Sequence, residues 1–176
     1  MRIIDLHCYP GTKEWIACQG PYVEALAKYW KRNWVGKPED AVIREFSDAG
    51  VEACLVALDL ESTIGTQPVG NDYVHAMWKR HAKRIIQCWG ALDPFKKDVA
   101  AEARKAVKQY GFIGFHFHPI MQHFAVDDAR ARPMFEEIAK FKLPERMLVL
   151  DDLPVSTFGK VSKKALSEMA TRDAHH

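Results

Sequence analysis

Apolar and polar residues occur in blocks along the chain, and these blocks predict a regular alternation of strands and helices. Short, nearly continuous apolar runs between turn residues indicate buried strands, whereas apolar residues three and four positions apart indicate amphipathic helices. The predicted strands cover 2–6, 51–58, 84–92, 112–117 and 147–150. The predicted helices cover 21–34, 38–49, 71–81, 98–110, 131–140 and 161–170, and a polar loop covers 59–70.

Glycine follows two of the predicted helices directly before a strand begins. Gly50 and Gly111 stand just after the last helical residue, where glycine readily takes the left-handed conformation that ends a helix. Apolar strands that alternate with helices pair in parallel through right-handed crossovers. We therefore expect an α/β fold with a parallel sheet. A closed (βα)8 barrel takes about 250 residues, so we expect 176 residues to be too few to close one.

Composition places the chain among ordinary globular proteins. Hydrophobic residues make up 48% of the sequence and charged residues 27%, with a net charge of +2, which supplies one sizeable core and argues against disorder. No apolar run approaches the roughly 18–20 residues of a membrane span, so we expect no membrane partner. Basic residues form no stripe with aromatic platforms, so we expect no nucleic acid partner. The N-terminus lacks a signal-peptide pattern, which favours a cytoplasmic protein.

The four cysteines are Cys8, Cys18, Cys54 and Cys88, and they are far apart in the sequence. No pair has CxxC spacing, so we expect neither a disulfide framework nor a zinc ribbon. Cys8 follows His7 directly, but neighbouring side chains of a strand point to opposite faces. We therefore do not expect Cys8 to act as a thiolate nucleophile activated by His7.

Polar residues gather where the predicted strands end. In parallel sheets the loops that follow the strands meet at one edge and carry the functional groups. The residues found there are Asp5, His7, Cys8, Tyr9, Asp59, Glu61, Asp93, His116, His118, Asp151 and Asp152. Strand ends are also polar simply because they run into loops, so position alone does not assign a role.

Two strand ends carry a stronger signal. Asp5, His7 and Tyr9 share one face of an extended strand because they are two residues apart, and His116 and His118 share a face for the same reason. Neutral imidazole is a common ligand of zinc-like metals, and such a metal would activate water or polarise a carbonyl. The alternative is that the histidines pack inside the sheet and form hydrogen bonds with each other or with the backbone.

Three segments carry a family resemblance: IDLHCYP at 4–10, ALDP at 91–94 and GFIGFHFHP at 111–119, the last followed by Gln122 and Phe124. They resemble the amidohydrolase-related family, in the branch that includes aminocarboxymuconate-semialdehyde decarboxylase and related aromatic-acid decarboxylases and hydrolases. The resemblance covers about residues 1–144 and implies a metal-dependent TIM barrel. We therefore expect a partial TIM barrel: a (βα)4 half-barrel over 1–144, followed by a short extra βα tail over 145–176.

The family's usual metal ligands are matched only in part. Its Asp-x-His-x-His motif supplies two histidines from the first strand, and later strands supply further histidines and an aspartate. His7 matches the first histidine, but Tyr9 replaces the second, and a phenol binds metal poorly until it ionises near pH 10. The later ligands have no counterpart, and whether Asp151 replaces one is open. The resemblance implies a divalent metal, zinc or manganese, with His7 as its ligand.

By this resemblance, the chain is expected to be a metal-dependent hydrolase or decarboxylase for an aromatic or acyl-CoA-derived carboxylic substrate. Because the later ligands are missing, we expect impaired activity, and the resemblance leaves open whether the chain is an enzyme. The expected site residues are His116, His118 and Tyr9 for catalysis, His7 for the metal, and Asp59 and Asp93 for the substrate. Without a metal, His118 would still serve as general acid or base, because its ordinary pKa lies near neutrality.

The end of the chain resembles a different family. Residues 143–154 and 159–166 are similar to the C-terminal end of an adenylate-forming acyl-CoA ligase. In that family the lysine that matches Lys160 contacts the carboxylate and phosphate during adenylation. The full phosphate-loop pattern is absent around Lys160, and we expect no detectable ATP binding.

The alternative to an enzyme is a catalytically inactive half-barrel remnant that self-associates. An open half-barrel exposes two sheet edges and an apolar interior face. A homodimer formed through the open barrel face would bury both.

Overall fold

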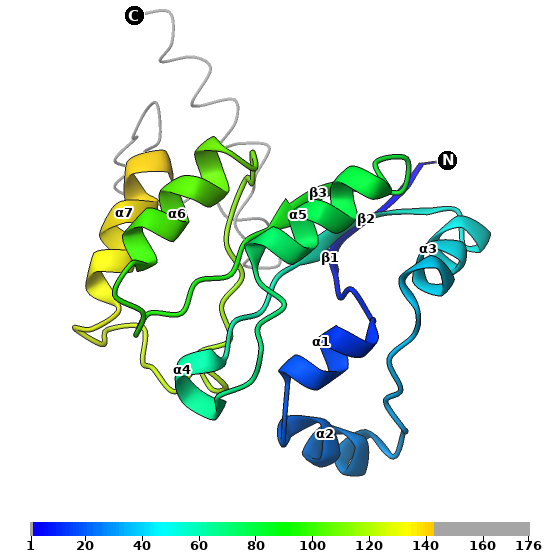
Figure 1. The fold of residues 1–176 in the computed structure, drawn as a ribbon, viewed down its shortest axis with the longest axis horizontal. Helices are drawn as coiled ribbons and strands as arrows, with labels where there is room; N and C mark the ends of the chain where they lie inside the picture. The colour runs from blue at the N-terminus through cyan, green and yellow to red at the C-terminus, as the bar shows by residue number, and fades with distance from the viewer. Residues whose placement is uncertain (1, 143–176) are drawn as a thin grey trace, which may run out of the picture. The chain divides into compact units, whose positions relative to one another are not determined.

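The computed structural model describes residues 2–142, which form a small parallel sheet accompanied by helices (Figure 1). The elements follow in the order β1 (Ile3–Cys8), α1 (Lys13–Cys18), α2 (Tyr22–Trp30), α3 (Glu39–Asp48), β2 (Val51–Val56), α4 (Glu61–Ile64), α5 (Asn71–Arg80), β3 (Ile85–Trp89), α6 (Val99–Lys108) and α7 (Arg132–Lys142). The strand predicted at 147–150 and the helix predicted at 161–170 lie outside the described residues. No helix in this part of the chain has the length and apolar character to cross a membrane.

The sheet has the order β1-β2-β3, and both pairs are parallel. Ile3 lies opposite Val51, and Ala53 lies opposite Ile85. The central strand β2 is the most apolar, and its residues from Ala53 onward are buried. The mixed α/β class and the parallel pairing expected from the sequence are therefore confirmed, and a three-strand sheet is consistent with a partial TIM-like domain.

The predicted strand at 112–117 is not a regular strand. Its backbone runs parallel to β3 but forms a single bridge, between Gly90 and Phe115. The bridge is held by two hydrogen bonds, from Gly90 N–H to the Gly114 carbonyl and from His116 N–H to the Gly90 carbonyl. A Cβ atom at Gly114 would lie 2.1 Å from the Trp89 ring. The Trp89 indole therefore packs against the backbone at Gly114, in the space that a side chain at this position would occupy.

The helices confirm most of the predicted pattern, with differences in short segments. Helices α3, α5, α6 and α7 match their predicted ranges within two residues. The helix predicted at 21–34 ends at Trp30, because Lys31 takes a left-handed conformation with φ of 51°. Two helices were not predicted, α1 and α4, with six and four residues. Both are too short to show a helical period; the side chain of Thr12 caps α1 by accepting a hydrogen bond from Trp15 N–H.

Two clusters of buried apolar side chains form the core. The first surrounds the sheet and includes Leu55, Met77 and Ile85, each completely buried. The second joins α6 to α7 through Ala103 and Met134. Burial of a large apolar side chain stabilises the fold by about 1.5–3 kcal/mol. This packing holds the strands in place at the edge where their carboxyl ends meet.

Candidate active site

Four of the six predicted site residues lie together at the carboxyl ends of the strands. The ring centroid of His7 lies 4.9 Å from that of His116 and 5.2 Å from that of Tyr9. The rings of His116 and His118 are 6.5 Å apart. His7 and Tyr9 come from the end of β1, whereas both other histidines come from the segment beside β3. The shared faces expected from the period of two therefore meet in space.

Backbone hydrogen bonds hold two of these histidines. The N–H of His7 donates to the Asp5 carboxylate at 2.9 Å. The N–H of His116 donates to the Gly90 carbonyl at 2.6 Å, and its ring Nδ1 lies 3.2 Å from the Ala57 carbonyl oxygen. His116 thus bonds to the backbone, as the alternative interpretation expected, while its ring still faces a cavity beside His118.

The surroundings of the two histidines in the segment beside β3 favour their neutral forms. Burial lowers the pKa of His116; the hydrogen bond to Ala57 opposes this effect, and repulsion from His7 and His118 adds to it. Burial also lowers the pKa of His118. A neutral imidazole accepts a proton through one ring nitrogen, so both can act as bases near pH 7.

Tyr9 and Cys8, which lie next to His7, both have raised pKa values that limit their chemical roles. Burial raises the pKa of Tyr9, so its phenol keeps the proton and serves as a donor. Burial, and then the charge of Asp5, raise the pKa of Cys8 to about 12. Because the thiolate is the reactive form, Cys8 is inert at neutral pH. All four cysteines are free.

An aromatic cavity of about 710 Å³ opens in front of His116 and His118. Aromatic side chains from α1, α2 and the segments after β1 and α2 line much of its wall: Tyr9, Trp15, Tyr22, Tyr29, Trp30 and Trp34. Arg32 places a cation in the same wall. This aromatic wall was not predicted from the sequence, although residues 22–34 include Tyr22, Tyr29, Trp30 and Trp34.

Two contacts fix parts of this wall. The rings of Tyr9 and Trp15 stack at 5.0 Å with an interplanar angle of 21°. The hydroxyl of Tyr22 on α2 lies 2.9 Å from Nε2 of His123, in the segment before α7. His123 has a positive φ of 53°, a conformation that is uncommon outside glycine but that histidine adopts more readily than most residues. The second contact joins α2 to the segment that follows His118.

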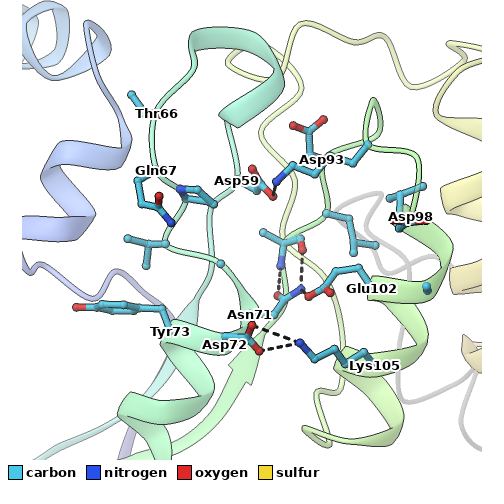
Figure 2. A pocket seen from close by; sticks show the side chains of 18 of the residues that line it. Asp59, Thr66, Gln67, Asn71, Asp72, Tyr73, Asp93, Asp98, Glu102 and Lys105 are labelled. Carbon is cyan, nitrogen blue, oxygen red and sulfur yellow. Dashed lines mark hydrogen bonds and ion pairs between the residues drawn. The ribbon is translucent and has the colours of Figure 1, made fainter.

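Asp59 and Asp93 lie apart from this cavity. They line a second one of about 940 Å³, which Figure 2 shows together with the Asp72–Lys105 ion pair. Asp59 forms an ion pair with Lys96 at 2.6 Å. The two carboxylate oxygens of Asp93 accept hydrogen bonds from the backbone N–H groups of Ser62 and Phe95. These contacts organise the loops after β2 and β3. The substrate-binding role expected for Asp59 and Asp93 stays a prediction.

The described residues do not complete a metal site. Within residues 2–142, no group of three or more histidine, cysteine, aspartate or glutamate side chains is arranged to hold an ion. A catalytic zinc needs about three protein ligands. His7 and His116 offer a pair, and Nδ1 of His116 already faces the Ala57 carbonyl. We therefore derive no step through a metal from these residues, and Asp151 and Lys160 lie outside them.

Histidines at the carboxyl ends of parallel strands, next to a concave cavity, are arranged as at a candidate ligand or active site of an α/β fold. The chain matches the family model described as amidohydrolase over residues 14–160, most of its length, and it therefore belongs to the amidohydrolase family. Members of this family typically use divalent metals. The match begins after the His7 motif and continues beyond residue 144, where the expected resemblance ended.

Comparisons with curated proteins and with solved structures gave no match. The family membership expected from the sequence is thus confirmed. The closer resemblance to aminocarboxymuconate-semialdehyde decarboxylase and the ligase-like end of the chain stay predictions.

Proposed function

We propose that the chain is a hydrolase or decarboxylase that acts on an aromatic or acyl-CoA-derived carboxylic substrate in the aromatic cavity. One observation carries this proposal: the neutral imidazoles of His116 and His118 both line a cavity whose wall is largely aromatic. Family membership supports the hydrolase or decarboxylase class.

The cavity wall suits a planar substrate with a negative charge. Aromatic side chains pack in offset or edge-to-face geometry against another ring, so Trp15 and Tyr22 would select a flat substrate. The guanidinium of Arg32 binds carboxylates well, because its fork of N–H donors matches the two carboxylate oxygens. A ring packed among the aromatic residues with its carboxylate near Arg32 would lie within the space that His116 and His118 line.

The histidines would act as bases in this arrangement. In hydrolysis, the neutral His118 ring takes a proton from water while the water oxygen attacks the substrate carbonyl, and it then returns that proton to the leaving group. The Tyr9 phenol keeps its proton and can donate a hydrogen bond to the developing oxyanion. In decarboxylation, a protonated histidine would instead deliver a proton to the carbon that loses carbon dioxide. The lowered pKa values favour the base, and hence hydrolysis.

The experiment is an activity screen of the purified full chain with aryl acyl-CoA thioesters and aromatic carboxylic acids. Release of free thiol reports hydrolysis, and release of carbon dioxide reports decarboxylation. His118→Gln is expected to lower kcat by about a hundredfold, the lower limit for a general acid or base. The matched control is His75→Gln, because His75 stacks on Tyr110 and does not line this cavity. Full activity in His118→Gln would refute the proposed role.

Self-association through the open barrel face stays a prediction. Ile3, Ile4 and Leu6 of the edge strand β1 are exposed large apolar side chains, with 62% exposure for Leu6. Exposed apolar strands at a sheet edge favour pairing with another chain. Light scattering at micromolar concentration tests this, since the mass of a monomer would rule out the homodimer.

A further inference from the structure

Gln122 is a buried polar residue that joins two strand ends. Its side chain is among the completely buried ones, with 2% exposure. The amide Nε2 donates to the carbonyl of Leu92 at 2.8 Å and to the carbonyl of Asp59 at 3.1 Å. Asp59 follows β2 and Leu92 follows β3. One side-chain amide therefore holds together the loops at the carboxyl ends of two neighbouring strands.

The same side chain also holds His118. Its Oε1 accepts a hydrogen bond from the His118 backbone N–H at 2.9 Å. The Gln122 backbone N–H donates to the His118 carbonyl at 2.8 Å. Both peptide groups of His118 are thus fixed to one residue, which is itself anchored to β2 and β3.

We propose that Gln122 is a positioning residue that sets the place of the His118 imidazole in the aromatic cavity. The inference deepens the proposed function and rests on it. A primary amide suits this position because it provides two donors and an acceptor, and three backbone groups require that combination. An ionised carboxylate at this position would provide no donor. A methionine would provide no donor and only a weak acceptor. Because the position is buried, water cannot easily replace the lost hydrogen bonds.

The arrangement separates His118 from its neighbour. His116 is held independently, through the carbonyls of Gly90 and Ala57, and its ring is the titratable group next to the His118 ring, 6.5 Å away. Tyr9 and Arg32 line the same cavity. Loss of the Gln122 amide should therefore change the surroundings of His118 more than those of His116. A general loss of stability would not distinguish between the two rings.

The test is an NMR titration of the histidine rings in the full chain carrying Gln122→Met. Loosening the segment admits water to the His118 ring, so the pKa of His118 should rise toward its ordinary value. His116 should shift less. The matched control is Gln109→Met at the exposed end of α6, which should change neither ring. A folded Gln122→Met chain in which His118 titrates as before would overturn the proposal.

A measurement on the unaltered chain covers the case in which Gln122→Met does not fold. Hydrogen exchange of the two side-chain amide protons of Gln122 should be at least about a hundredfold slower than that of Gln109, because both protons are in buried hydrogen bonds. Exchange at the rate of Gln109 would overturn the proposal.

Kinetics then separate this inference from the proposed function. With an active substrate, Gln122→Glu should lower kcat about tenfold or more with little change in KM, because the chemistry and not the binding wall is disturbed. An unchanged kcat would overturn the positioning role. If His118→Gln were fully active while the titration of His118 still depended on Gln122, the proposed function would fail and the structural link would stand.

Discussion

The Nδ1 atom of His116 lies 3.2 Å from the carbonyl oxygen of Ala57, the residue directly after β2. A carbonyl oxygen only accepts hydrogen bonds, so Nδ1 of the neutral ring carries the proton and Nε2 keeps its lone pair. The end of the central strand thus selects the tautomer of a ring from another segment. This contact leaves one basic nitrogen for the cavity.

The pH dependence of the reaction should reflect these neutral rings. Burial lowers the pKa of His116 and of His118, and a base is active above its pKa. We expect kcat/KM for thioester hydrolysis to stay level as the pH falls from 8 to about 6.5, the ordinary histidine value, and to decline only below it. The measurement is kcat/KM against pH for the full chain. A midpoint above the ordinary histidine pKa would contradict the assignment.

Arg32 should contribute to substrate binding more than to the chemistry. Arg32 is exposed and lines the aromatic cavity. We expect Arg32→Gln to raise KM for a carboxylic substrate about tenfold with little change in kcat, because one charge-assisted contact is lost. Arg44→Gln is the matched control, since Arg44 lies on α3 and does not line this cavity. A kcat loss without a KM change would place Arg32 in the chemistry instead.

Measuring the metal content of the purified chain tests whether its residues bind a metal ion although residues 2–142 alone provide too few ligands. The described residues provide a His7–His116 pair and no third ligand, so extensive dialysis should leave well under one equivalent of zinc or manganese. Mass spectrometry of the dialysed chain measures this directly. A full equivalent that disappears in His7→Ala would show that side chains beyond residue 142 complete a site. A full equivalent that survives in His7→Ala would remove His7 from it.

Most helices and the strands β1 to β3 could be predicted because the patterns that indicate them lie within short stretches of sequence. Gly50 and Gly111 have φ values of 66° and 71°, so glycine marks the ends of α3 and α6 as expected. The apolar run of β2 reflects burial on both sides. The expected strand at 112–117 is reduced to a single bridge, and its backbone contacts the ring of Trp89 beside Gly114. A local sequence pattern does not reveal such a contact between segments that are distant in sequence.

The site could be predicted only where the period of two decides which side chains share a face. That rule placed His7 beside Tyr9 and His116 beside His118, and the ring centroids of these two pairs lie 5.2 and 6.5 Å apart. It could not place Asp59, because Asp59 lies beyond β2 in a loop that its ion pair with Lys96 helps to fix. The aromatic wall and the hydrogen bonds of Gln122 could not be predicted either, because they join segments that are far apart in the sequence.

The close packing of Trp89 on Gly114 gives a prediction about stability. An added Cβ would lie 2.1 Å from the ring, which is much closer than atoms can approach. The indole has little freedom to move away, since its Nε1–H donates to the Leu6 carbonyl at 2.8 Å and so joins β3 to β1. We therefore expect Gly114→Ala to lower the free energy of unfolding by about 2 kcal/mol, typical of overpacking.

Urea denaturation of four chains would measure this coupling: the original chain, Gly114→Ala, Trp89→Leu and the double variant. The smaller leucine leaves room for the new methyl group, so Gly114→Ala should cost much less when Trp89→Leu is already present. An interaction energy of about 1 kcal/mol or more is expected for two residues in contact. Additive effects would mean that the Trp89 ring does not limit the side chain at position 114.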